Sequence, residues 1–217
     1  MIAKAQLDLL RRRIGGQLPG LEAHERMMPA TRKTIYRDIT IPDNAKKSAT
    51  LILLYPSENG LHFPLIERTE YPGVHSKQIS FPGGAWEESD PDYIATALRE
   101  AEEEIGVNRH QIEVIGLLSS LYIPPSNFWV QPVIGYVDRK PEFIADPNEV
   151  AAVFPAPLAD LLSGTLNGES KIHHSSGIHL TVPSYTIDGR IVWGATAMMI
   201  SEMVELLGNE KLEMRNE

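Results

Sequence analysis

A helix with one apolar stripe and one acidic face is the feature that most constrains the fold of this 217-residue chain. Ser89 or Asp90 suits the N-cap position, and Pro91 suits the first turn. Gly106 is a typical residue at a helix end, so the sequence predicts a helix over residues 89–106. At about 100° per residue, four apolar side chains fall within one narrow arc: Ile94, Leu98, Ala101 and Ile105. This stripe must be buried against another element of the protein.

Three glutamates occupy a second face of the same helix. Glu100, Glu103 and Glu104 fall within an arc of about 100°, whereas Glu102 projects away from them. Like charges at this spacing weaken a helix, so helix stability does not explain the pattern. A solvated acidic face is one interpretation. A metal site is the other, because Mg2+ prefers oxygen ligands and usually takes one or two carboxylates together with waters and substrate phosphates.

Two neighbouring features favour the metal site. Arg99 lies four residues before Glu103 and can orient that carboxylate through a hydrogen bond. The glycine pair Gly83–Gly84 precedes the helix and allows the backbone to approach a ligand closely.

The rest of the chain alternates between strand-like and helix-like patterns. An amphipathic helix is predicted from Ile2 to about Ile14, followed by a loop over residues 18–29. Apolar runs predict strands at residues 49–55, 63–66, 112–122, 128–137 and 150–154, a short helix at 157–162, a hairpin over 169–193 and a closing helix over 195–207. We predict one domain over residues 1–217, with residues 1–30 as an N-terminal helical extension. Its fold class is expected to be α+β, with helices on both faces of a mixed sheet.

Composition excludes several classes of protein. The 42% hydrophobic and 23% charged residues are ordinary for a globular protein, which excludes disordered and fibrous chains. The sequence contains no apolar run long enough for a transmembrane helix, and no membrane association is expected. The absence of cysteine excludes disulfides and thiol catalysis and favours a cytoplasmic protein. The formal net charge of −9 argues against nucleic-acid binding, but it permits an anionic substrate if metal cations lie between the two.

Residues 81–107 resemble the Nudix box, whose pattern is G-x5-E-x7-R-E-U-x-E-E-x-G-U, where U is apolar. The positions that fit are Gly84, Arg99, Glu100, Ala101, Glu103, Glu104, Gly106 and Val107. Asp90 stands where the pattern has glutamate, and eight residues rather than seven separate it from Arg99. The resemblance implies a Nudix-like α/β/α sandwich and a hydrolase that uses Mg2+ or Mn2+ to cleave a diphosphate linkage in a nucleotide conjugate.

The flanks of the box are similar to the coenzyme A pyrophosphatase branch of that family. That branch has a segment like L-L-T-x-R-S-x3-R-x3-G-x3-F-P-G-G, and this chain has Leu65–Thr69 followed by Phe81–Gly84. The chain departs from the pattern at Gly73, where the branch has arginine, and at Lys77, where it has glycine. Three further segments look like the branch: residues 18–29, 149–150 and 181–207.

The resemblance implies a role for each candidate residue. The expected metal ligands are Glu100, Glu104 and Glu103. Arg99 is expected to support catalysis, and either Glu103 or Glu149 would take a proton from the attacking water; the sequence does not separate these two. The expected substrate-binding residues are Arg68, Lys77, Phe81, Gly83 and Gly84. Residues 122–128 could form a further part of the substrate pocket.

The expected reaction is therefore hydrolysis of coenzyme A or an acyl derivative to 3′,5′-ADP and the 4′-phosphopantetheine portion. A Nudix enzyme for ADP-ribose, a dinucleotide or a dinucleoside polyphosphate is the alternative, and Gly73 and Lys77 keep it open. A binding module without catalysis would have lost carboxylates of the box, and all three are present here. Trp193 and Met198–Met199 are interpreted as core or dimer contacts, which leaves a homodimer open.

Overall fold

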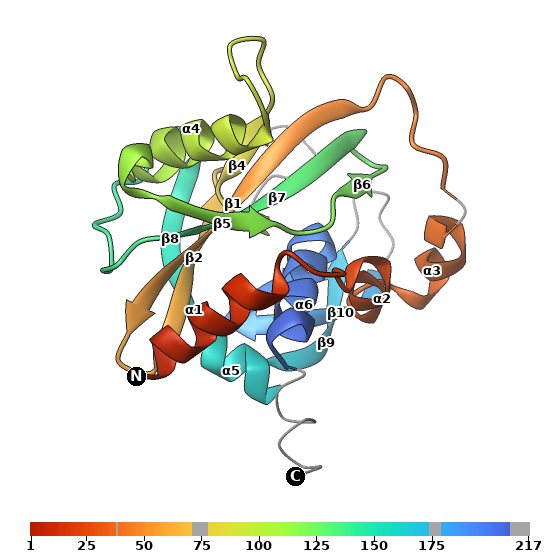
Figure 1. The fold of residues 1–217 in the computed structure, drawn as a ribbon. Coiled ribbons are helices and arrows are strands. Elements are labelled where there is room, and N and C mark those ends of the chain that lie inside the picture. Colours follow the sequence, from red (N-terminus) through yellow and green to blue (C-terminus); the bar gives the residue numbers. More distant parts are fainter. Residues whose placement is uncertain (38, 71–77, 174–178, 209–217) are drawn as a thin grey trace.

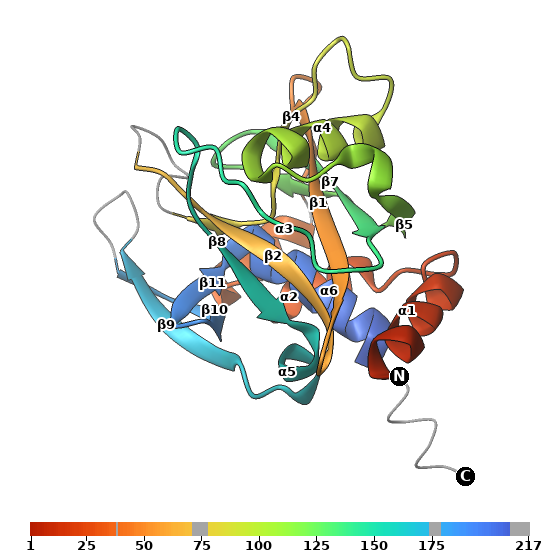
Figure 2. The same ribbon diagram turned by 90° about the vertical axis from the view of Figure 1, so that its left-hand side faces the viewer.

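The computed structural model describes residues 1–37, 39–70, 78–173 and 179–208. A mixed eight-stranded sheet forms its centre, and a three-stranded antiparallel sheet lies beside it (Figures 1 and 2). The strands of the large sheet are β1 (Lys46–Ser57), β2 (Gly60–Arg68), β3 (Ile79–Ser80), β4 (Gly83–Ala85), β5 (Glu113–Leu117), β6 (Leu121–Ile123), β7 (Phe128–Tyr136) and β8 (Val150–Pro157). Those of the small sheet are β9 (Asn167–His173), β10 (His179–Ile187) and β11 (Arg190–Trp193). The helices are α1 (Ile2–Arg13), α2 (Gly20–Arg26), α3 (Ala30–Arg37), α4 (Tyr93–Ile105), α5 (Leu158–Ser163) and α6 (Gly194–Gly208), with a short 3-10 helix at Arg109–Gln111.

Strand β1 lies in the middle of the large sheet because its side chains are apolar on both faces. It runs parallel to β7 and antiparallel to β2 and β4. Leu51 and Leu53 are buried in the same apolar cluster as α4, whereas Ile52 and Leu54 belong to the cluster on the opposite face. Both faces of the sheet are therefore available for helix packing.

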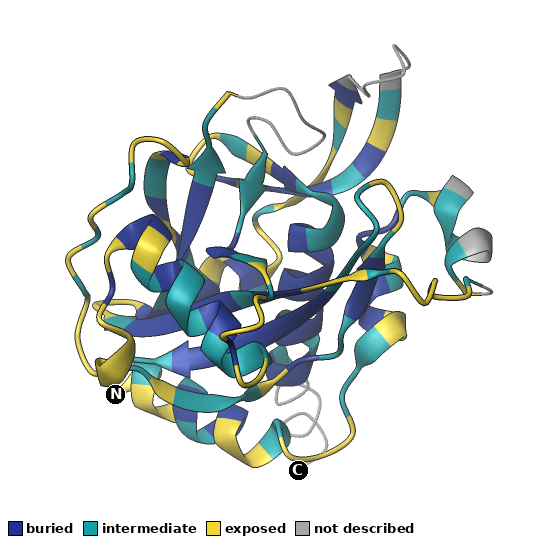
Figure 3. Ribbon diagram, turned by 90° about the horizontal axis from the view of Figure 1, so that it is seen from above, coloured by how far each residue is buried: buried dark blue, intermediate teal, exposed yellow. Residues whose placement is uncertain are grey.

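Helices cover both faces, as the sequence predicts. The apolar stripe of α4, including Ala101 and Ile105, packs on one face, and Leu10 of α1 and Met203 of α6 pack on the other. Figure 1 shows α4 on one side of the sheet and α1, α2 and α6 on the opposite side. Seen from above, the central strands are mostly buried, and exposed residues gather on helix surfaces and connecting segments (Figure 3). The α+β class with an α/β/α sandwich is thereby confirmed. Among the described helices, none has the length and apolar character of a membrane span.

Helix α4 begins later than the sequence predicts. Its N-cap is Asp92, whose carboxylate accepts an N–H from the first turn, rather than Ser89 or Asp90. Asp90 is buried instead, where it serves the site described below. Gly106 ends the helix as expected, with a left-handed φ of 71°.

The predicted loop over residues 18–29 is wrong, because it contains helix α2. Helix α3, which follows at once, was also not predicted. Both are short, with 7 and 8 residues, and helices of this length take their stability from tertiary contacts rather than from local propensity.

A buried carboxylate fastens α2 to α6. Glu202 is fully buried and accepts hydrogen bonds from the backbone N–H groups of Gly20 and Ser119, at 3.1 and 3.2 Å. The Nε2 atom of His24, also buried, lies 2.9 Å from its other oxygen. Burial alone would raise the pKa of Glu202, but the hydrogen bonds from His24 and Ser119 lower it overall.

Two strand predictions need adjustment. The run at residues 112–122 divides into β5 and β6, both paired with β7. The hairpin expected over residues 169–193 is a three-stranded sheet, since two turn signals separate three strands.

Candidate active site

The glutamates of α4 differ sharply in their exposure. The side chain of Glu104 is 2% exposed, that of Glu100 16% and that of Glu103 60%. Glu102 points elsewhere and pairs with Arg109, with its carboxylate 3.3 Å from the guanidinium. The helical phase inferred from the sequence is therefore right for the direction of Glu102, and the acidic face runs from solvent into the protein interior.

Glu104 is the deepest of these carboxylates. One of its oxygens accepts a hydrogen bond from the backbone N–H of Gly83 at 2.8 Å, and the other accepts one from Arg68 at 3.0 Å. Burial raises the pKa of Glu104 to about 7, although Arg68 and the Gly83 N–H act in the opposite direction. Strands β2 and β4 thus hold a carboxylate whose negative charge is only partly compensated.

Each of the two glycines before the helix lies against one glutamate: Gly83 against Glu104 and Gly84 against Glu100. Gly83 has a φ of +152°, and a Cβ there would lie 2.3 Å from the carbonyl oxygen of Ala49 on β1. A Cβ on Gly84 would lie 2.4 Å from the carboxylate of Glu100. Burial raises the pKa of Glu100, against the effect of its hydrogen bond from Arg99. The glycine pair therefore lets the backbone approach these carboxylates closely, and its expected contact with substrate stays a prediction.

Arg99 connects the acidic face to the segment before the helix. It donates to Glu100 and to Glu103, both at 3.0 Å, so it contacts Glu103 as expected and one more carboxylate besides. It also donates to both oxygens of Asp90, at 3.1 and 2.9 Å, and to the carbonyl oxygen of Ala85 at 3.0 Å. Arg99 thus fixes the positions of two site carboxylates relative to strand β4.

The partner of Arg99 is the residue that replaces the glutamate of the box. The Arg99 guanidinium lowers the pKa of Asp90 to about 2, helped by hydrogen bonds from the N–H of Glu87 and the hydroxyl of Thr96. From the sequence, Asp90 is a departure from the box and a candidate N-cap, and its pairing with Arg99 is a finding of the structure. Its spacing to Arg99 was the available signal.

We expect Asp90→Asn to lower the free energy of unfolding at pH 7 by about 1–3 kcal/mol, because a buried charge-assisted pair is lost. The folded-state pKa lies below the usual 3.8, so the stabilisation is present above about pH 4 and is lost as the pH falls toward 2. Urea unfolding of both proteins between pH 2 and 7 checks this. A stability difference that does not shrink with acid would contradict the assigned pair.

Glu149 approaches the same place from the loop before β8. Its carboxylate lies 3.9 Å from the Arg68 guanidinium and is half-exposed. Its negative charge contributes to raising the pKa of both Glu100 and Glu104. The structure therefore brings together Arg68, Arg99 and all four candidate glutamates.

Phe81 and Lys77 are the other two residues that the sequence predicts to bind substrate. Phe81 is 1% exposed, and its ring packs 5.5 Å from that of Phe63 between centroids. Phe81 therefore supports the glycine pair from the core, and its expected contact with substrate stays a prediction. Lys77 and Gly73 lie outside the described residues.

Comparison with known proteins identifies the family. The NUDIX domain matches residues 45–174. A Cronobacter sakazakii protein named "Uncharacterized Nudix hydrolase NudL" is 34% identical over 172 residues, which cover 77% of this chain and 85% of that protein. The protein of the same name from Klebsiella pneumoniae strain 342 is 36% identical over 148 residues, or 66% and 74% of the two chains. The chain belongs to the Nudix family. Among solved structures, a MutT/nudix family protein from Enterococcus faecalis is 17% identical, with a TM-score of 0.48 over 88% of this chain and 78% of that one.

As a Nudix hydrolase, this protein is a pyrophosphohydrolase, an enzyme that cleaves a diphosphate linkage. Nudix enzymes generally use divalent metal ions. Within the described ranges, no three acidic or histidine side chains already form a ligand cage. Mg2+ does not require one, since two carboxylates with waters and phosphate oxygens suffice. Glu100 and Glu104 provide two partly compensated carboxylates, with Glu149 beside them, so the donor set fits a hard divalent cation.

Proposed function

We propose that this Nudix hydrolase cleaves coenzyme A or an acyl-coenzyme A to 3′,5′-ADP and the corresponding 4′-phosphopantetheine. The observation that supports the proposal is the position of Arg68 and Gly83. Both belong to the segment that resembles the coenzyme A branch, and both bind the same buried oxygen pair of Glu104. The similarity to the two NudL proteins supports the family assignment on which the proposal depends.

In the proposed mechanism, water attacks one phosphorus of the diphosphate and the other phosphate leaves. Glu100 and Glu104 would hold Mg2+ or Mn2+, which when bound neutralises phosphate charge and lowers the pKa of the attacking water. Arg68 holds Glu104 in place, and Arg99 holds Glu100 and Glu103. The chain thus contributes oriented carboxylates rather than a covalent nucleophile.

A carboxylate must also accept the proton of the water. We propose Glu149, because its charge acts on both Glu100 and Glu104 while the closest Arg68 nitrogen is 3.9 Å away. Glu103 is the alternative, but its carboxylate is already engaged by a hydrogen bond from Arg99 at 3.0 Å.

The test is a hydrolysis assay with added Mg2+ on coenzyme A, 3′-dephospho-coenzyme A, ADP-ribose, a dinucleoside polyphosphate and a nicotinamide dinucleotide. We expect the highest kcat/KM for coenzyme A compounds, 3′,5′-ADP among the products, and no turnover after chelation of divalent cations. Preference for ADP-ribose or a dinucleotide would instead assign the enzyme to the alternative substrate class.

The position of Arg68 leads to a separate prediction. Among the expected substrate-binding residues, Arg68 and Lys77 are the two cations that could meet the 3′-phosphate of coenzyme A, but Arg68 already donates to Glu104. Arg68→Ala should therefore reduce kcat/KM about 10–100-fold, and equally for coenzyme A and its 3′-dephospho form, because it disturbs a ligand and not a phosphate contact. Arg109→Ala, which removes a surface arginine paired with Glu102, is the matched control. A loss confined to coenzyme A would place Arg68 at the 3′-phosphate.

A further inference from the structure

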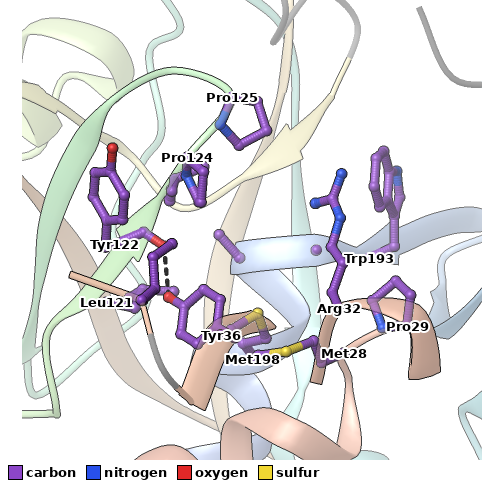
Figure 4. Close-up of a pocket in the computed structure, with 14 residues that line it drawn as sticks. Met28, Pro29, Arg32, Tyr36, Leu121, Tyr122, Pro124, Pro125, Trp193 and Met198 are labelled. Atoms are coloured by element: carbon purple, nitrogen blue, oxygen red, sulfur yellow. Dashed lines mark hydrogen bonds between the residues drawn. The ribbon is translucent and has the colours of Figure 1, made fainter. Parts of the chain in front are cut away.

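An apolar cavity of about 230 Å³ lies between α3, the β6–β7 connection and the start of α6. Its wall is formed by Met28, Pro29, Arg32, Tyr36, Ile39, Leu121, Tyr122, Ile123, Pro124, Pro125, Trp193, Gly194, Ala195 and Met198. Figure 4 shows Tyr36, Met28 and Met198 on one side, with Pro124 and Pro125 facing Trp193 across the space. Methionine side chains adapt to varied apolar shapes, so this wall suits a flexible apolar group.

The two tyrosine hydroxyls of the wall are already engaged. The hydroxyl of Tyr36 donates to the carbonyl oxygen of Tyr122 at 2.5 Å, and the hydroxyl of Tyr122 donates to Asn127 at 2.8 Å. A nucleobase placed here would lose its hydrogen bonds to water with few replacements, which is costly. An alkyl chain needs no such partners and gains free energy from burial.

Arg32 is the exception in this apolar wall. In the described part of the chain, its guanidinium has no hydrogen-bond or ion-pair partner, and it extends along Trp193 (Figure 4). A guanidinium has five N–H donors and no acceptor, so it suits carbonyl oxygens at the mouth of the cavity. An alkyl chain attached through a thioester and followed by amides matches the combination of an apolar wall and the Arg32 donors.

The cavity is connected to the catalytic elements through α6. Thr196 donates to the carbonyl oxygen of Ile79 on β3 at 2.9 Å. The hydroxyl of Thr50 lies 3.5 Å from the sulfur of Met199, and Thr50 pairs with Gly83, whose N–H binds Glu104. These contacts tie the start of α6, which lines the cavity, to the two strands that lead to Glu104.

We propose that this cavity is the subsite for the acyl chain of an acyl-coenzyme A, with Arg32 facing the thioester and amide carbonyls at its mouth. The inference rests on the proposed coenzyme A function and adds a preference for acylated substrates. The adenosine 3′-phosphate end is the other group that an apolar cavity with an arginine could take, and the experiment distinguishes the two.

The experiment measures kcat/KM for coenzyme A and its acetyl, butanoyl, hexanoyl and octanoyl thioesters at a fixed Mg2+ concentration. We expect a rise of about tenfold or more from coenzyme A to the preferred chain length, because each buried methylene adds apolar burial. Ala195→Leu fills part of the cavity and should reduce this ratio to within about twofold of one. Ala5→Leu makes the same change on the exposed face of α1 and should keep the wild-type ratio. Melting curves by circular dichroism confirm that each variant is folded.

Two further variants make the outcome decisive. Trp193→Ala enlarges the cavity and should shift the preferred chain to a greater length, which provides the test if Ala195→Leu fails to fold. Arg32→Ala should leave the ratio between coenzyme A and 3′-dephospho-coenzyme A at its wild-type value. Loss of that discrimination would assign the cavity to the adenosine end and overturn the proposal.

The remaining outcomes separate this inference from the proposed function. Equal kcat/KM for coenzyme A and all its thioesters, or a chain preference that persists in folded Ala195→Leu, overturns the acyl subsite alone. Absence of turnover on every coenzyme A compound, with turnover on ADP-ribose, overturns both.

Discussion

Replacing Glu104 by glutamine should lower kcat by about 10³-fold or more, because it removes a charged ligand from the metal-assisted step. The carboxylate is buried between the Gly83 N–H and Arg68, and its surroundings leave it short of positive charge. A neutral amide of the same shape keeps the packing, so we expect the free energy of unfolding to change by no more than about 1 kcal/mol. Steady-state kinetics at saturating Mg2+ and urea unfolding measure the two quantities.

Glu102→Gln is the matched control for this prediction. It makes the same chemical change on the same helix, but Glu102 faces Arg109 and not the site. Its kcat should stay within about twofold of the wild-type value. Near-normal turnover in Glu104→Gln would refute the proposed metal ligand, whereas a comparable loss in Glu102→Gln would show that the acidic face of α4 is assigned wrongly.

Gly84→Ala should lower kcat by about 10²-fold while the protein stays folded. The new methyl group would lie 2.4 Å from the carboxylate of Glu100, which is the movable end of a side chain. The backbone can therefore remain in place, but Glu100 must shift away from its position beside Arg99. A displacement of about 1 Å at a catalytic group is enough for a loss of this size.

Gly83→Ala provides the contrast. Its methyl group would lie 2.3 Å from the carbonyl oxygen of Ala49, which is backbone, and its φ of +152° suits only glycine. We expect a loss of folded protein rather than a selective loss of kcat. Thermal melts alongside kinetics separate the two effects. If Gly84→Ala unfolds as readily as Gly83→Ala, the assigned contact with Glu100 is wrong.

The part of the site that the sequence could predict is the part controlled by helical periodicity. The direction of Glu102 relative to Glu104 follows from 100° per residue, and the burial of Ala101 follows from the same angle. The pairing of Arg68 with Glu104 is different, because it depends on how β2 lies against α4, and no local pattern contains that information. The burial of Phe81 was missed for a similar reason, since an aromatic residue in a loop has no periodicity from which its direction can be read.

Asp90 shows how a departure from a pattern can be informative. At this position the chain has aspartate instead of glutamate, which is one methylene shorter, and one more residue separates it from Arg99. Arg99 nevertheless donates two hydrogen bonds to the Asp90 carboxylate. The early start predicted for α4 failed because Asp90 and Asp92 both suit an N-cap, and tertiary burial decides between them.

The buried carboxylate of Glu202 affects which fragments of this protein can fold and which substitutions can accumulate in it during evolution. In the sequence, α2 precedes and α6 follows the NUDIX-matching segment 45–174. In the fold the two helices pack together, and Glu202 also holds the β5–β6 connection through Ser119. A fragment limited to residues 45–174 would lack both helices and leave one apolar face of its sheet bare. We therefore expect that the catalytic segment does not fold on its own. His24 and Glu202 should covary among relatives, with a replacement of one accompanied by a compensating replacement of the other.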